Sequence, residues 1–329
     1  MNRFASRRAA LAAGITLALA SAVPSVLAQG SYPDKPIKLA VGFAPGTGPD
    51  ILTRTAGQAF ADIVGQSVVV ENRTGAGGQI ATGAVAKSPA DGYNLLVADL
   101  SSISIAPAAF SKLTYDPAKE LVPVTEIART DLVLVVPASM AANNVQEFVK
   151  LTKAANGATN FATFGAGTPG HFGAVMLAEM AGYKTEIVHF RQTSDVITAL
   201  GGGQVQAALM STPLAAAQIK GGRLKALATT AAKRSPLMPE VPTFAEAGLP
   251  KADFSAWFVV FAPTGTPQPI VDRIQRDMVR AVQAPETRKK LEEAGFTVVG
   301  STQAEARKMV ASENERWARV VKSSGFKGD

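Results

Sequence analysis

The six residues GAGTPG, positions 165–170, have the spacing G-x-G-x-x-G, and His171 follows them directly. This spacing lets a backbone turn approach the pyrophosphate of a dinucleotide closely. The segment lies between an expected strand, residues 159–164, and an expected helix, residues 171–182. Two chemistries are therefore open at this loop. In the first, the loop binds a nicotinamide or flavin dinucleotide. In the second, its glycines hold some other anion.

The next expected strand argues against a dinucleotide. A dinucleotide fold normally places an acidic residue at the end of the strand after the glycine loop, where the acid binds ribose. Here the next strand is residues 185–190; its acid, Glu186, stands near the start, and Arg191 and Gln192 follow the end. Pro169 also removes one backbone N–H from the loop. We therefore expect no dinucleotide and no other cofactor.

The residue sets of common hydrolases and metal sites are also missing. The chain has no cysteine, and the G-x-S-x-G turn of a serine nucleophile does not occur in it. Its two histidines, His171 and His189, have no ligand partner four residues away. We expect His189 to be a packed strand residue, whereas His171 borders the glycine loop and has a structural or a ligand role. The sequence predicts that the protein is not an enzyme and holds no metal.

Three segments share one arrangement, in which glycines and small hydroxyl residues separate an expected strand from a helix. They are APGTGPD (44–50), NRTGAGGQ (72–79) and TFGAGTPGH (163–171). The first turn of a helix has unpaired N–H groups and a partial positive charge, which together bind carboxylate or phosphate. Glycine adds close approach and positive φ angles. Because ligands of open α/β sheets bind at the carboxyl ends of the strands, the three loops predict an anion-binding cleft.

Short β-branched runs alternate with Ala- and Leu-rich segments, which is typical of an α/β fold with largely parallel sheets. Strands are expected at residues 37–44, 67–73, 93–100, 131–139, 159–164, 185–190, 205–211, 224–230 and from 256 onward. Two similar strand–loop–helix series and a C-terminal return predict two lobes. We expect residues 29–130 to form the first part of lobe 1 and 131–252 to form lobe 2. Residues 253–329 then return to lobe 1 with C-terminal helices.

The N-terminus has the pattern of an export signal. MNRFASRR carries three arginines and no acid, an apolar stretch follows, and small residues precede Ala28. We expect cleavage after about Ala28 and a periplasmic protein, with the general and the twin-arginine export routes both open. Removing three arginines and no acid lowers the formal net charge from +7 to +4. There is no basic run that would indicate nucleic acid, and no later apolar run reaches the roughly 18–20 residues of a membrane span.

Five segments of the chain match a known family in order. They are YPDKPIKLAVGFAPGTGPDILTR, VGQSVVVENRTGAGGQIATGAVAKSPADGYNLL, GGGQVQAAL, IKGGRLKALATTAAKRSPLMPEVPTFAEAGLP and FAPTGTPQPIV. From about Tyr32 to the C-terminus the chain resembles the Bug receptors, the extracytoplasmic solute receptors of tripartite tricarboxylate transporters. The resemblance implies a two-lobed, type II-like periplasmic binding protein with a ligand cleft between two mostly parallel sheets. It also implies a monomer that captures a small carboxylate by lobe closure and delivers it to membrane permease subunits.

The resemblance further implies which residues bind the ligand. They come from the first and second glycine loops and the end of the third strand in lobe 1, and from the facing loop in lobe 2. The residues are Ala44, Gly46, Thr47, Gly48, Gly75, Ala76, Gly77, Ser101, Ser102, Thr163, Phe164, Gly165, Gly167, Thr168 and His171. Family ligands are held mostly by backbone groups, hydroxyls and water rather than by a salt bridge.

Departures from the family pattern bear on specificity. Thr47 replaces a usual glycine, and Arg191 and Gln192 stand where lysine and glycine are common. Ser211 lies in a turn that usually contains an aspartate, so one negative charge is missing there. We add Arg191 and Ser211 to the expected ligand residues. Three roles are open for Asp99, which lies two residues before Ser101. It could bind a ligand ammonium, pair with Arg191 or be a solvated loop acid.

Three further residues are expected to have structural roles. Asp50 follows Pro49 and is expected to complement the dipole of its helix rather than contact the ligand. Trp257 and Phe258 match an aromatic pair of the family, and we expect them to pack near the hinge or the cleft wall.

The expected cleft combines aromatic side chains with neutral donors and one added cation. Its members are Phe43, Phe164, Phe172, Trp257 and Arg191. A carboxylate would satisfy the guanidinium in a partly dry cleft, so a dicarboxylate with a flat or apolar middle, aromatic compounds included, fits best. The alternative is that Arg191 points into solvent and the aromatic side chains pack within the lobes. A sensory receptor that feeds a signalling partner is also open, because the sequence does not separate it from a transport receptor.

Overall fold

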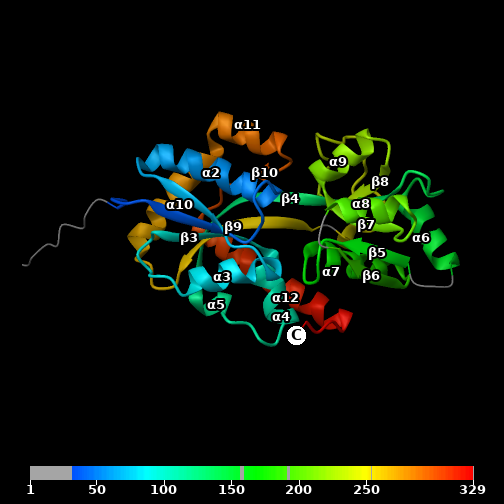
Figure 1. Cartoon of the computed structure of the whole chain (residues 1–329), viewed down its shortest axis with the longest axis horizontal. Helices are drawn as coiled ribbons and strands as arrows, with labels where there is room; N and C mark the ends of the chain where they lie inside the picture. Colours follow the sequence, from blue (N-terminus) through cyan, green and yellow to red (C-terminus); the bar gives the residue numbers. More distant parts are fainter. Residues whose placement is uncertain (1–31, 156–158, 191–192, 253, 329) are drawn as a thin grey trace, which may run out of the picture. The chain divides into compact units, whose positions relative to one another are not determined.

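The computed structural model describes residues 32–155, 159–190, 193–252 and 254–328. The expected export signal, with its cleavage site at Ala28, lies outside the described residues, and so do Arg191 and Gln192. Lys35–Asp329 form one compact unit, to which all of the following refers. It has two lobes, and Figure 1 shows β4 and β9 running from one lobe into the other.

Lobe 1 is built on β1 (Ile37–Val41), β2 (Val68–Asn72), β3 (Asn94–Asp99), β9 (Ser255–Pro263), the first part of β4 (Leu121–Pro137) and β10 (Thr297–Val298). The strand order is β2-β1-β3-β9-β4, with β10 beside β4. β1 is parallel to both β2 and β3, because α2 (Gly48–Val64) and α3 (Gln79–Ala86) return the chain to the same edge each time. The carboxyl ends of these parallel strands therefore lie together.

Lobe 2 repeats this plan. β5 (Thr159–Thr163) lies parallel to β6 (Thr185–His189) and to β7 (Ala207–Ser211), while β7 and β8 (Leu224–Thr229) run antiparallel to the second part of β4. The connecting helices are α6 (Val145–Ala154), α7 (Pro169–Ala181), α8 (Thr193–Gly201) and α9 (Thr212–Lys220). The two-lobed α/β fold is as expected, but the sheets are mixed rather than mostly parallel. β4 and β9 run antiparallel to their neighbours as they cross between the lobes.

β4 joins the two lobes through one continuous strand. Its residues Leu121–Asp131 pair with β9, and from Leu132 onward it pairs with β7 and β8. The sequence placed this strand at residues 131–139 and so missed its first half. The lobe boundaries at 130 and 252 stay predictions.

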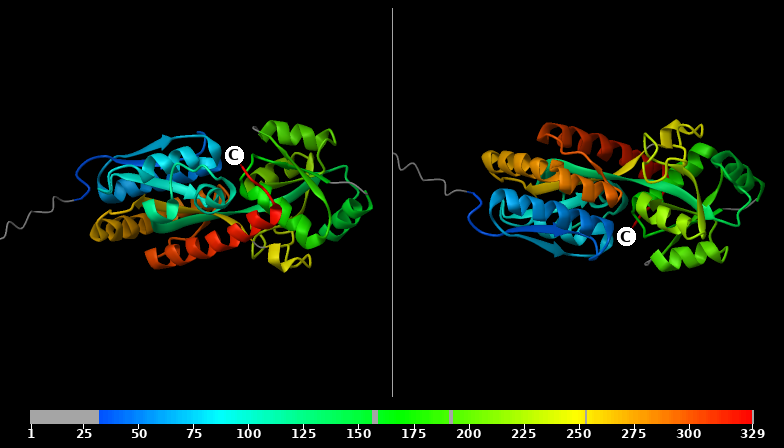
Figure 2. Two further views of the ribbon diagram at one scale, coloured as in Figure 1. Left: turned by 90° about the horizontal axis from the view of Figure 1, so that it is seen from below. Right: turned by 90° about the horizontal axis from the view of Figure 1, so that it is seen from above.

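The remaining helices cover the sheets. They are α4 (Ala106–Ala109), α5 (Pro117–Glu120), α10 (Gln268–Gln283), α11 (Pro285–Glu293) and α12 (Gln303–Ser324), with short turns η1 (Ala76–Gly78), η2 (Ser101–Ile105) and η3 (Pro250–Ala252). α12 begins at a capping box in which Thr302 and Glu305 satisfy each other's backbone N–H groups. It packs against β4, η2 and α7, and Figure 2 shows it, in red, beside the crossing strands and reaching lobe 2. None of the described helices is long and apolar enough to cross a membrane.

Candidate functional site

The first glycine loop joins β1 to α2. Ala44, Gly46 and Gly48 are exposed, and Thr47 is half-buried. The Thr47 hydroxyl donates a hydrogen bond of 2.7 Å to the Ala44 carbonyl, which closes the turn. Gly46 has φ +79°, and no described atom would lie within 4 Å of a Cβ there. The loop thus presents open backbone at the start of a helix, as an anion site requires.

A buried carboxylate fixes this loop from behind. Asp50 is 2% exposed and accepts the Gly46 N–H at 2.8 Å, the Arg54 Nε–H at 3.0 Å and an Asn72 amide N–H at 2.7 Å. The same Asn72 amide nitrogen also donates to the Phe43 carbonyl at 2.9 Å. Burial alone would raise the pKa of Asp50, but these hydrogen bonds outweigh it and hold the pKa below its ordinary value. Asp50 therefore lies in the first turn of α2, as expected, and stabilises the loop by accepting the Gly46 N–H.

The second glycine loop follows β2. Gly75, Ala76, Gly77 and Gly78 all have positive φ, and Ala76 is the one non-glycine residue with positive φ among those the structure describes. Gly75, Ala76 and Gly77 are exposed. A Cβ at Gly77 would lie 4.0 Å from the Cβ of Ser101. The second loop and the end of β3 are therefore neighbours.

The hydroxyls at the end of β3 are buried and already paired. Ser101 donates its hydroxyl to Asp99 at 2.8 Å, and Ser102 accepts a hydrogen bond of 2.8 Å from the Thr82 hydroxyl. Asp99 is 4% exposed, so its interpretation as a solvated loop acid is wrong. Burial raises the pKa of Asp99 to about 6, against the opposing effect of its hydrogen bonds from Ser101. Ser101 and Ser102 are therefore buried within lobe 1, and their expected contact with a ligand stays a prediction.

The third glycine loop joins β5 to α7 in lobe 2. Thr168 caps α7: its hydroxyl oxygen accepts the His171 N–H at 3.3 Å, and its O–H donates to the Gly165 carbonyl at 2.9 Å. The Gly167 N–H donates to Nδ1 of His171 at 3.2 Å. Gly165 and Gly167 have φ of +123° and +76°, so the loop requires glycine at both positions. Phe164 borders it and is half-buried.

The two histidines of the chain meet beside this loop. Their ring centroids are 4.8 Å apart and the rings are nearly perpendicular. His171 is 4% exposed, and burial, with a smaller effect from His189, lowers the pKa of His171 to about 4. His189 lies at the exposed end of β6, and its Nδ1 is 2.7 Å from the hydroxyl of the buried Thr163. His189 is the last residue of β6 and its ring packs against His171, as expected of a packed strand residue, although the residue is exposed. His171 lies in the first turn of α7, at the other side of the same contact.

The expected gathering of aromatic side chains is only partly present. Phe43 and Phe164 are half-buried at the loops, but Phe172 is fully buried and belongs to the hydrophobic core. Phe172 faces inward because α7 is buried along most of its length. Trp257 is 2% exposed on β9, and Phe258 packs edge-on against Phe296, with ring centroids 5.7 Å apart.

Ser211 ends β7 and is half-buried at the start of α9, next to the buried Thr212, whose hydroxyl donates to the Asp131 carbonyl. Arg191 lies outside the described residues. Its expected contact with a carboxylate therefore stays a prediction.

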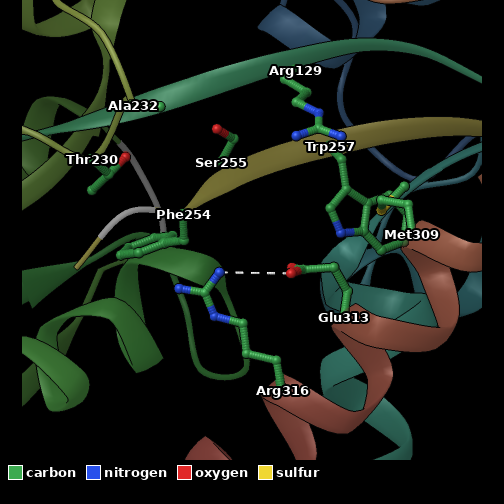
Figure 3. Close-up of a pocket in the computed structure, with 9 residues that line it drawn as sticks. All are labelled: Arg129, Thr230, Ala232, Phe254, Ser255, Trp257, Met309, Glu313 and Arg316. Carbon is green, nitrogen blue, oxygen red and sulfur yellow. Dashed lines mark ion pairs between the residues drawn. The ribbon is translucent and has the colours of Figure 1, made fainter. Parts of the chain in front are cut away.

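Two cavities lie beside the crossing strands, and the larger is lined by Phe296, whose ring would lie 3.5 Å from a Cβ at Gly48 in the first glycine loop. The smaller, about 150 Å³, is shown in Figure 3 and is lined by Arg129, Thr230, Ala232, Phe254, Ser255, Trp257, Met309, Glu313 and Arg316. Its charged groups are paired: Arg129 with Glu126, and Arg316 with Glu313. The larger, about 630 Å³, lies between residues 231–237 and 292–297. Neither of these two is lined by an expected ligand residue within the described part of the chain.

The sequence did not predict the hydrogen-bonded group of Asp50, Arg54 and Asn72 behind the first loop, which we call the brace. The spacing of Asp50 and Arg54, four residues apart on one helix, is a visible signal for an ion pair. Asn72 gives no such signal, because it comes from the end of β2 and meets Asp50 only once β1 and β2 have paired.

Comparisons with known proteins agree with this geometry. Residues 52–326 match the family described as the tripartite tricarboxylate transporter family receptor. The chain is 34% identical to protein BugT of Bordetella pertussis, over 95% of this chain and 96% of BugT.

Solved structures give the same result. A Rhodopseudomonas palustris protein solved with adipate is 29% identical and superposes with a TM-score of 0.81, covering 90% of this chain and 99% of that one. MatC from R. palustris, solved with bound malate, is 30% identical with a TM-score of 0.77, covering 88% of this chain and 100% of that one. Both similarities span the two lobes described above. The chain belongs to the tripartite tricarboxylate transporter receptor family.

Proposed function

We propose that this protein is a periplasmic receptor that binds a small dicarboxylate between its lobes and delivers it to the permease subunits of a tripartite transporter. The observation that carries the proposal is the pair of glycine loops that open α2 in lobe 1 and α7 in lobe 2. Each combines a positive-φ glycine with a helix start at the carboxyl end of a parallel strand. Two helix N-termini from different lobes suit the two ends of a dianion.

The relatives support a carboxylate as the ligand class. Two proteins of the same fold were solved with malate and with adipate, which are both dicarboxylates. The exposed backbone of the first two loops and the first turns of α2 and α7 can hold such a ligand without a salt bridge. Arg191, which follows β6, is proposed to pair with the second carboxylate.

The proposal assigns no catalytic step to the protein. The described histidines are engaged with Thr163, Gly167 and each other, and no cluster of metal-ligating side chains occurs among the described residues. Binding and release are the expected activity, and the lobes close around the ligand because a bridging ligand favours the closed population.

A ligand screen tests this function. Purified mature protein is scanned by thermal unfolding with malate, adipate, aromatic diacids and matched monoacids. A true ligand at one hundred times its Kd adds about 2.7 kcal/mol to the free energy of unfolding. Scattering with a tight ligand should show compaction, and binding without compaction would contradict lobe closure.

Arg191→Ala then tests the second carboxylate. If Arg191 contacts it, diacids lose about 1.5–3 kcal/mol of binding free energy and monoacids lose much less. Equal losses for diacids and monoacids, or none for either, would reject this role of Arg191.

A further inference from the structure

The C-terminal tail, residues 325–328, is fixed to lobe 1 where it leaves α12. The Gly328 N–H donates to the Ala109 carbonyl at 2.8 Å, and Gly328 forms a parallel bridge with Phe110. A Cβ at Gly328 would lie 2.4 Å from the Phe110 ring, so the tail fits there only because this residue is glycine. In Figure 1 the chain ends beside α4 and α12.

From this anchored tail, the Phe326 ring contacts the start of α7 in lobe 2. Its centroid lies 4.9 Å from that of His171, with an interplanar angle of 82°, and 5.5 Å from that of Phe172, at 85°. Phe110 completes the group at 6.2 Å and 81°. Edge-to-face pairs at about 4.5–7 Å are attractive, so Phe326 holds the His171 ring in one orientation.

The orientation of His171 matters to the third glycine loop. Its Nδ1 accepts the Gly167 N–H, so in this arrangement Nδ1 carries no proton. Gly167 also lies against lobe 1, because a Cβ there would be 3.1 Å from the Phe110 ring. The loop is therefore fixed by a path that runs from Phe326 through His171 to Gly167.

We propose that Phe326 is a positioning residue for the ligand: acting through His171, it holds the Gly165–Thr168 loop in the conformation that receives the carboxylate. This inference rests on the proposed function, in which that loop binds one end of the ligand. The C-terminal tail is anchored to lobe 1 and contacts α7 of lobe 2, so in this proposal it contributes to ligand affinity. The burial of the His171 ring, which lowers its pKa, depends in part on the same contact.

The first test needs no ligand. The chain has two histidines, so ring ¹⁵N spectra of the mature protein contain two sets of signals, assigned with His189→Gln. In Phe326→Ala, water reaches His171, so its pKa should rise from about 4 toward the ordinary value and its ring signals should shift. Phe326→Leu and Phe326→Tyr should restore burial and the wild-type signals. Unchanged His171 signals in Phe326→Ala would overturn the inference.

The second test measures affinity for malate and adipate by calorimetry. Phe326→Ala should weaken binding of whichever probe the wild type binds by about tenfold, and Phe326→Tyr should keep most of the affinity. Met309→Ala is the matched control, because it removes a half-buried apolar side chain from α12, the helix that leads into the tail, at the small cavity instead of the loop. An equal loss in Met309→Ala, or an unchanged affinity in Phe326→Ala, would overturn the inference. A wild type that binds neither these two probes nor any diacid of the ligand screen, while the His171 signals still respond to Phe326→Ala, would refute the proposed function and leave the positioning of His171 by Phe326 standing.

Discussion

The backbone N–H of Gly46 donates to the carboxylate of Asp50 at 2.8 Å, so one donor of the first glycine loop is used by the protein itself. The brace formed by Asp50, Arg54 and Asn72 then determines which donors of the loop face outward. In the proposed function, a ligand carboxylate would meet a loop whose shape is set before the ligand arrives, which would lower the ordering cost of binding.

Asp50→Ala should lower the free energy of unfolding by about 1–3 kcal/mol and weaken ligand binding, because it removes the buried acceptor of hydrogen bonds from Gly46, Arg54 and Asn72. Urea unfolding and calorimetry measure the two effects. Asp62→Asn is the control on the same helix, since Asp62 is exposed and pairs only with Gln58 among the hydrogen bonds described. A stable Asp50→Ala protein with normal affinity would show that the brace is unimportant.

The free energy of unfolding should depend on pH through His171 and Asp99, whose pKa values are shifted in opposite directions. His171 has a folded pKa of about 4, below its ordinary value, so its contribution is present above about pH 6.5 and is lost as pH falls toward 4. Asp99 has a folded pKa of about 6, above its ordinary value, so its contribution is present below about pH 4 and is lost as pH rises through 6. The two trends oppose each other between pH 4 and 6.

Asp99→Asn separates the two trends. The variant should gain stability relative to wild type at pH 7, where the buried carboxylate is charged, and gain less at pH 5. Its unfolding free energy should then rise more steeply with pH between 4 and 6 than that of the wild type. Urea titrations at each pH measure this, and a parallel pH dependence in both proteins would contradict the assignment.

Gly46→Val and Gly165→Val should abolish carboxylate binding while the protein stays folded. Both positions have positive φ, which a β-branched residue resists, and the added side chain would occupy space in front of the loop. Gly203→Val is the matched control: Gly203 has φ +72°, and no described atom would lie within 4 Å of a Cβ there, but it follows α8 away from the loops. Binding should survive in the control, and survival in all three variants would remove the loops from the site.

Trp257→Phe should cost less stability than Trp317→Phe, because both changes remove buried ring atoms but, among the described residues, only the second removes a hydrogen bond. The indole N–H of Trp257 is buried and has no hydrogen-bond partner among the described residues, so its removal relieves an unpaired donor. Trp317→Phe provides the contrast, since the Trp317 N–H donates to Glu313 at 2.9 Å and its loss should destabilise by about 1–2 kcal/mol. Thermal unfolding of the two variants compares them directly, and an equal loss in both would show that the Trp257 N–H is satisfied.

The sequence predicted those parts of the fold that local patterns determine. β1, β3, β5 and α7 lie where hydrophobic runs and glycine loops placed them, because each strand and its following helix are contiguous in the chain. The first half of β4 was missed, since Thr125, Glu126 and Arg129 interrupt its apolar pattern; Thr125 and Glu126 are nevertheless buried, and Glu126 pairs with Arg129.

The three glycine loops of the candidate site could be predicted from the sequence, but the burial of the side chains next to them could not. Glycine spacing identified the three loops, whereas nothing local indicated that Asp99 and Phe172 face inward. Asp99 is the register partner of Phe258 on β9, and Phe172 packs against Phe326, so each has a neighbour more than a hundred residues later in the chain. Such contacts depend on tertiary packing rather than on local spacing.

The continuous strand β4 has a consequence for how such receptors can be recombined. Asp131 on β4 and Ser255 on β9 are register partners, so the chain enters and leaves lobe 2 at adjacent points on two paired strands. The intervening segment, residues 132–254, therefore has its two ends side by side, so it can be exchanged as one unit. Exchanging it for the corresponding segment of a relative preserves the β4–β9 ladder on the lobe 1 side. Such a chimera would take lobe 1 from one parent and lobe 2 from the other. The set of diacids that it binds would show which lobe discriminates between them.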